Sequence, residues 1–171
     1  DKKKRPYISK MVRNDFLYNE DVCYGKNRPD YMVITEGITD AMIAEMKNIP
    51  VISPVTRKFR NDDIERLQKL LKFIDNIYLA NDNEENEKGL EGALDTAAEL
   101  SKTSKEVKIT VLPRENGEKK VDLNNFLQGK TKAEFERFLE ENSEIYQEFL
   151  FTKALQHKDE GEQQEYEAMR K

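Results

Sequence analysis

The sequence is poor in the residues that bind soft metals and cross-link small domains. Its 171 residues include one cysteine, Cys23, and one histidine, His157. A lone cysteine excludes an internal disulfide framework, and one residue of each type cannot build a cysteine- or histidine-based zinc site. We therefore expect no zinc in this chain, and a metal bound here would have to take oxygen ligands.

A membrane segment and a secretory signal are also lacking. No apolar run approaches the roughly 18 residues that span a bilayer, and the opening DKKKRP has no apolar stretch like that of a signal peptide. We expect no membrane partner and a cytoplasmic location. Because the chain begins with Asp1 rather than methionine, we also expect it to be part of a longer protein.

Charge is abundant but unevenly spread. The chain has 29 basic and 34 acidic side chains, which gives a net charge of −5. This average argues weakly against a nucleic-acid-binding protein, because phosphate binding depends on clustered Lys and Arg. The first thirteen residues nevertheless hold six basic side chains and one acidic one, whereas residues 82–91 hold five acidic and one basic.

Short apolar runs alternate with segments of helical spacing between residues 31 and 112. Runs rich in β-branched and aromatic residues predict strands at 31–35, 51–53, 74–80 and 107–112. Apolar residues three and four apart predict helices at 38–47, 62–72 and 90–100. The alternation predicts an α/β fold with a mostly parallel sheet, flanked by helices and wound by right-handed crossovers.

The pattern changes after Gly129. Aromatic and aliphatic residues between 135 and 150 recur at helical spacing with no strand signal, which predicts a helical hairpin over 130–156. Thr131 followed by Glu134 resembles a capping box at the start of the first helix. The remaining residues, 157–171, are almost wholly polar and predict an exposed helix or a linker.

Carboxylates and amides follow three of the predicted strands. Because ligands of open α/β sheets bind beyond the carboxyl ends of the strands, these side chains would share one rim. Gly37 is expected to allow a sharp turn from strand to helix without a Cβ clash. The candidate metal ligands at this rim are Glu36, Asp40, Asp82, Glu84, Asp122 and Asn124.

Converging carboxylates repel one another unless a cation neutralises them. Oxygen ligands without histidine or cysteine select Mg²⁺ or Mn²⁺, and these ions suit phosphoryl or nucleotidyl transfer. Simpler interpretations also exist for each element. The acidic run from Asp82 to Glu91 could be a solvated helix start, and Asp122 with Asn124 could cap a helix. Three such elements in order, each at a strand end, favour a site.

A basic loop follows the short second strand and would lie at the same rim. Its side chains, Arg57, Lys58 and Arg60, could bind triphosphate or template phosphate, or they could be solvated surface charge. We expect Cys23 to be a small buried hydrophobe rather than a nucleophile.

Three segments resemble the TOPRIM domain of bacterial-type primases, topoisomerases, repair proteins and some nucleases. MVITEGITDAM is similar to the family's Glu-Gly element, and YLANDNE to its Asp-x-Asp element, with Glu84 in place of the second aspartate. Gly89 lies further along the chain than the family's Ala-Gly. KKVDLNNFL resembles the third element of bacterial and phage primases, with an amide at Asn124. The resemblance covers residues 5–155.

This resemblance implies synthesis of RNA primers on single-stranded DNA from nucleoside triphosphates. Glu36 would act as general base or metal organiser, Asp82 and Glu84 would hold Mg²⁺ or Mn²⁺, and Asp40 and Asp122 would support them. It also implies three parts of the chain. Residues 1–30 would be a connector from a basic subdomain that this chain lacks, residues 31–129 a TOPRIM domain, and residues 130–156 a closing helical subdomain. A replicative helicase, in cis through the polar tail or in trans, is a further expected partner.

Two other functions remain open. A TOPRIM nuclease would use the same metals to hydrolyse a phosphodiester. A non-catalytic nucleic-acid-binding module would explain why Glu84 and the position of Gly89 differ from the family's pattern. A topoisomerase is disfavoured, because no tyrosine-bearing cleavage domain accompanies the core. A phage or plasmid origin would also suit the sequence and would place the protein in the host cytoplasm.

Overall fold

The computed structural model describes residues 16–24, 26–54, 59, 61–104, 106–115 and 117–156. The basic start of the chain, His157 and the polar tail predicted over 157–171 lie outside the described residues. Within the described ranges, no helix is long and apolar enough to cross a bilayer.

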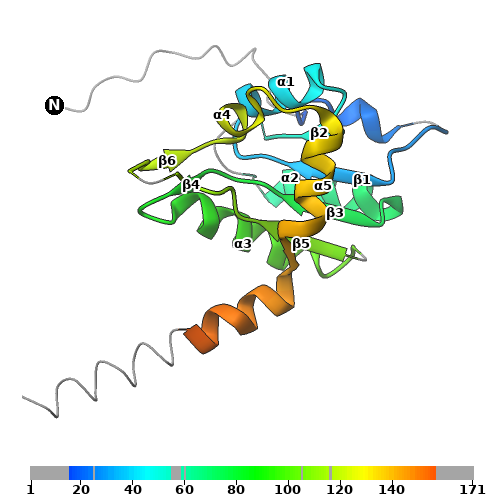
Figure 1. Cartoon of the computed structure of the whole chain (residues 1–171). Helices are drawn as coiled ribbons and strands as arrows, with labels where there is room; N and C mark the ends of the chain where they lie inside the picture. The colour runs from blue at the N-terminus through cyan, green and yellow to red at the C-terminus, as the bar shows by residue number, and fades with distance from the viewer. Residues whose placement is uncertain are drawn as a thin grey trace, which may run out of the picture.

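A five-stranded sheet with the order β2-β1-β3-β5-β7 forms the centre of the molecule (Figure 1). β1, β2, β3 and β5 run parallel to one another, as the alternation of elements predicts. All four lie within or next to the predicted apolar runs, at Tyr31–Ile34, Val51–Ile52, Asn76–Leu79 and Glu106–Thr110.

Both faces of this sheet are buried under helices. Successive residues of β1 alternate between the faces, with Met32 and Ile34 in one core and Val33 in the other. The first core also contains residues of α2 (Asn61–Leu70) and α3 (Lys88–Leu100), and the second those of α1 (Ile38–Met46), α4 (Leu123–Leu127) and α5 (Lys132–Asn142). Two short 3₁₀ helices, η1 (Glu20–Cys23) and η2 (Leu71–Phe73), complete the first layer, and Cys23 is buried there as expected.

The prediction of a helical hairpin after Gly129 is wrong in one respect. α5 and a helix at 146–156 are both present, but strand β7 (Ser143–Ile145) separates them and pairs antiparallel with β5. Its polar sequence carries no strand signal. The strand forms because the edge of β5 has backbone donors and acceptors to pair, and the Thr110 and Ser143 hydroxyls lie 2.8 Å apart across the two strands.

The predicted capping box at the start of α5 is confirmed. The Thr131 hydroxyl accepts a hydrogen bond from the Glu134 amide at 3.3 Å, and the Glu134 carboxylate accepts one from the Thr131 amide at 2.7 Å. Beyond β7, the helix at 146–156 projects away from the sheet (Figure 1), and Lys153 in it forms an ion pair with Glu87 at 2.9 Å.

A second, two-stranded sheet lies at the rim and has no counterpart among the predicted elements. β4 (Asn83–Glu84) pairs antiparallel with β6 (Lys120–Val121), and Glu84 stands opposite Lys120. Asn83 also donates a hydrogen bond to the backbone oxygen of Leu112 at 2.7 Å. This small sheet joins the segment after β3 to the segment before α4.

Candidate active site

Five predicted carboxylates line one open cavity of about 550 Å³ at the carboxyl ends of the parallel strands. Glu36 follows β1, Asp40 lies in the first turn of α1, and Asp82 follows β3. Glu84 lies in β4, and Asp122 is the N-cap residue of α4. The rim that the sequence predicts is therefore a shared cavity, and the residues come from three separate parts of the chain.

Asn124, the sixth predicted ligand, is joined to the site through its backbone. Its amide donates a hydrogen bond to Oδ1 of Asp40 at 3.0 Å, which connects α4 to α1. Burial raises the pKa of Asp40 to about 6, and the negative charges of Asp82 and Asp122 add to the rise. The hydrogen bond from Asn124 and the charge of Lys120 act in the opposite direction. Asp40 therefore takes up a proton at a higher pH than an ordinary aspartate does.

Asp122 has the capping role that the simpler interpretation assigns to it. Its Oδ1 accepts a hydrogen bond from the amide of Asn125 at 2.8 Å, at the start of α4. The cap fixes the position of the carboxylate, and Asp122 still lines the cavity. The two interpretations of this residue are thus compatible.

Lys120 lies between two of the carboxylates. Its Nζ is 2.5 Å from Oδ2 of Asp82 and 3.0 Å from Oε1 of Glu84. Hydrogen bonding to these partners, Asp82 foremost, raises the pKa of Lys120, and the hydrogen bond from Lys120 lowers the pKa of Glu84. The sequence assigns no function to Lys120. Its membership of the third TOPRIM-like segment, KKVDLNNFL, is the one feature of the sequence that could have indicated a role at the site.

Two glycines hold the backbone close to the carboxylates. Gly37 has φ −122° and ψ 147°, an extended conformation that any residue adopts, so the turn does not need glycine for its backbone angles. The predicted avoidance of a Cβ clash is the part that the structure supports. Glycine matters there because a Cβ would lie 3.0 Å from Oδ2 of Asp40. At Gly89 a Cβ would lie 2.0 Å from the backbone oxygen of Asp82. Despite its shifted place in the sequence, Gly89 packs directly against the aspartate of the second segment.

The donor chemistry of the cavity suits a hard divalent cation, because it offers carboxylate oxygens from several elements. An ammonium group already lies between two of these carboxylates, so the position attracts positive charge. As the side chains stand, however, the described part of the chain contains no group of three or more acidic, histidine or cysteine residues close enough to enclose an ion. Binding would require Lys120 to move and the carboxylates to rotate inward.

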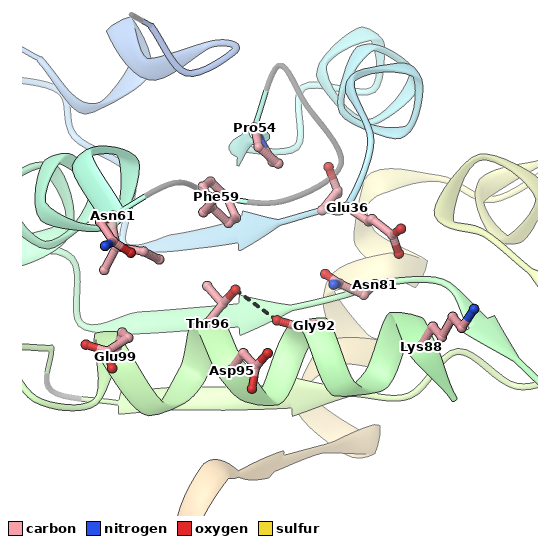
Figure 2. A pocket seen from close by; sticks show the side chains of 12 residues that line it. Glu36, Pro54, Phe59, Asn61, Asn81, Lys88, Gly92, Asp95, Thr96 and Glu99 are labelled. Carbon is pink, nitrogen blue, oxygen red and sulfur yellow. Dashed lines mark hydrogen bonds between the residues drawn. The ribbon is translucent and has the colours of Figure 1, made fainter. Parts of the chain in front are cut away.

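A second cavity of about 210 Å³ adjoins the first and shares Glu36, Pro54 and Lys88 with it. In Figure 2 it runs along α3 between Glu99 and Lys88, with Glu36 and Asn81 towards the Lys88 end. Space for a ligand thus extends from the acidic rim along one helix. The predicted phosphate-binding residues Arg57, Lys58 and Arg60 lie outside the described residues.

Neither a protein-family model nor a curated protein matches the sequence. The fold, by contrast, is similar to solved primase domains. A structure of the DnaG primase catalytic domain bound to ssDNA has a TM-score of 0.63 and 20% identity, over 85% of this chain and 45% of that chain. A DNA primase domain from Pseudomonas aeruginosa has a TM-score of 0.62 and 18% identity, over 82% of this chain and 41% of that chain.

The Aquifex aeolicus primase, in a structure with its zinc-binding and RNA polymerase domains, has a TM-score of 0.65 and 19% identity. That match covers 89% of this chain and 36% of the other. The chain therefore has the fold found in primase catalytic domains and spans less than half the length of each of these structures. The predicted fold class is confirmed, as is the predicted likeness to primases at the level of fold.

Proposed function

We propose that this chain is the TOPRIM core of a DNA primase of the bacterial or phage type, and that it synthesises RNA primers on single-stranded DNA by metal-dependent nucleotidyl transfer. The observation that carries the proposal is the single cavity lined by Glu36, Asp40, Asp82, Glu84 and Asp122. Residues of three TOPRIM-like segments meet there, on a fold like that of primase catalytic domains.

Glu36, Asp82 and Glu84 would hold Mg²⁺ or Mn²⁺ in this function. When bound, such ions orient the triphosphate and stabilise the charge that develops on the attacking and leaving oxygens. Glu36 follows β1 at the junction of the two cavities, where it can organise the 3′-hydroxyl of the primer or accept its proton. Asp40 and Asp122 would support the site, Asp40 by its contact with Asn124 and Asp122 by capping α4.

The positive side chains at the cavity would meet the phosphates. Lys88, at the start of α3, and Lys120 both line it, and they could approach a nucleoside triphosphate from two sides. Single-stranded DNA is the expected template, since one structure with this fold is a primase catalytic domain bound to ssDNA. A replicative helicase, in cis or in trans, remains a proposed partner.

Extension of an RNA primer already annealed to a DNA template tests this function, because it bypasses initiation. The chain is incubated with Mn²⁺, labelled ribonucleotides and the primed template, beside the variants Glu36→Gln and Asp82→Asn. We expect weak extension by the wild type, since the resemblance implies that a basic subdomain is missing from this chain. Both variants should lose about 100-fold or more, because both carboxylates would hold the metals and Glu36 would also act at the 3′-hydroxyl. Glu91→Gln, on the exposed surface of α3, is the matched control.

The same reactions distinguish the other two functions. Labelling the DNA strand as well reveals a nuclease, because the DNA would be shortened without ribonucleotide incorporation. Binding of single-stranded DNA with neither extension nor cleavage would indicate a non-catalytic module. Either result would contradict the primase proposal.

A further inference from the structure

We propose that Lys120 is a built-in counter-ion of the acidic cavity, which holds Asp82 and Glu84 together until a divalent ion displaces it. Lys120 would thereby set how tightly the site binds that ion. This inference rests on the proposed function, since it concerns the same cavity, and it assigns a regulatory task to a residue outside the predicted ligand set.

The contacts of Lys120 have the form expected for a cation held between two anions. Its Nζ lies 2.5 Å from Asp82 and 3.0 Å from Glu84. The carboxylate side chains are 11% and 23% exposed, so their charges are partly withdrawn from water. Two carboxylates in such surroundings repel each other unless positive charge lies nearby. Lys120 supplies that charge from within the chain.

The backbone of Lys120 is fixed while its side chain has access to solvent. β4 and β6 pair with Glu84 opposite Lys120, and the Glu85 amide extends the pairing by bonding to the Lys119 carbonyl at 3.1 Å. The Lys120 side chain is 47% exposed. The ammonium can therefore leave the carboxylates and enter water without disturbing the small sheet.

An ion and the ammonium cannot use the same oxygens together. Magnesium binds oxygen at about 2.0–2.1 Å and demands near-octahedral geometry, whereas the ammonium now lies within hydrogen-bonding distance of one oxygen from each carboxylate. An ion that takes these two oxygens must break both ion pairs, and breaking them weakens its net affinity. Once displaced, the ammonium remains at the rim, where it can meet a phosphate of the incoming nucleotide.

A lysine that merely fastens β4 to β6 would have a different effect. Its removal would loosen the carboxylates and weaken ion binding, whereas removal of a competing counter-ion strengthens it. The direction of the change in metal affinity therefore separates the two roles, and it can be measured without catalysis.

The test is a Mn²⁺ titration of the whole chain, with free Mn²⁺ measured by electron paramagnetic resonance. We expect Lys120→Gln to bind Mn²⁺ about ten-fold more tightly than the wild type, because a neutral side chain no longer competes. Lys120→Arg keeps the charge and should stay close to the wild type. Lys119→Gln, at the exposed neighbouring position, controls for a general change in surface charge.

A second measurement needs no folded variant. Addition of Mg²⁺ to the wild type should shift the NMR signal of Lys120 Cε as its ion pairs break, and an unchanged signal at saturating Mg²⁺ would overturn the inference. Equal or weaker Mn²⁺ binding by Lys120→Gln would also overturn it, while leaving the proposed function intact. Absence of Mn²⁺ binding by the wild type and every variant would overturn both.

Discussion

A Cβ atom placed on Gly89 would lie 2.0 Å from the backbone carbonyl oxygen of Asp82. Real Cβ atoms do not approach an oxygen so closely, so the first turn of α3 and the segment after β3 fit together because residue 89 has no side chain. The same segment carries the carboxylates that bind Lys120. A shift of helix α3 at Gly89 would therefore also move the backbone of Asp82 in the site.

Gly89→Ala should therefore destabilise the protein and displace Asp82. The backbone has to shift, and overpacking of this kind costs about 1–3 kcal/mol of the free energy of unfolding. Gly92→Ala is the matched control in the same helix, where the nearest atom to a Cβ is 3.6 Å away, on Asn81. There we expect a gain of about 0.5–1 kcal/mol from helix propensity. Urea unfolding of both variants measures the difference, and equal stabilities would contradict the packing argument.

Asp40→Asn should stabilise the metal-free protein above pH 6. Burial raises the pKa of Asp40 from 3.8 to about 6, so between these values the folded state binds more protons than the unfolded state. The stability that this group contributes therefore falls as the pH rises through that range. Asparagine carries no charge but can still accept the hydrogen bond from Asn124. The gain at pH 7.5 is expected to be up to about 3 kcal/mol.

The measurement is urea unfolding of wild type and Asp40→Asn at several pH values in the presence of EDTA. The difference between the two proteins follows the titration of Asp40, together with its charge interactions with Asp82 and Asp122. This difference should shrink towards zero below pH 4. A difference that stays constant across the whole range would show that the substitution acts through packing instead.

Thr131→Ala should weaken the start of α5 by about 1 kcal/mol, the usual effect of removing an N-cap side chain. The Thr131 hydroxyl accepts the hydrogen bond from the Glu134 amide, and α5 anchors Phe135 and Leu139 in the core beneath it. Thr131→Ser keeps the hydroxyl and should retain most of the stability. Thermal unfolding compares the three proteins, and a loss in the serine variant as large as in the alanine variant would exclude the cap as the cause.

The parallel core and the placement of the acidic residues could be predicted from the sequence for physical reasons. Buried strands such as β1 and β3 need continuous apolar runs, and the carboxyl ends of parallel strands share one edge. The sequence therefore predicts that Glu36 and Asp82 lie at one rim of the sheet.

The small sheet, β7 and the position of Lys120 could not be predicted in the same way. β4 and β6 have two residues each, which is too short to show a periodic pattern, and their pairing depends on how distant segments meet. Lys120 joins Asp82 only because β6 pairs with β4, 36 residues from Glu84 in the sequence. For Gly37 the sequence predicts a position where a Cβ would clash, but only the structure identifies the Asp40 carboxylate as the nearby group.

Phe135 is a core residue whose replacement should also disturb the candidate site. It is completely buried, and its ring lies 6.3 Å from that of Phe126 in α4. α4 begins at the cap formed by Asp122 and supplies the amide that binds Asp40. Phe135→Ala should lower the free energy of unfolding by about 3–5 kcal/mol, through lost apolar contact and the cavity left behind.

Phe151→Ala makes the same chemical change where the side chain is 67% exposed, so its effect should stay within about 0.5 kcal/mol. Urea unfolding gives both values. Amide hydrogen exchange at Asn124 then reports whether loss of the Phe135 ring loosens the contact with Asp40. If the Asn124 amide exchanges faster in Phe135→Ala than the loss of global stability accounts for, the aromatic rings of Phe126, Phe135 and Phe138 help to position the site. If the loss of global stability accounts for the whole change in exchange rate, Phe135 only stabilises the core.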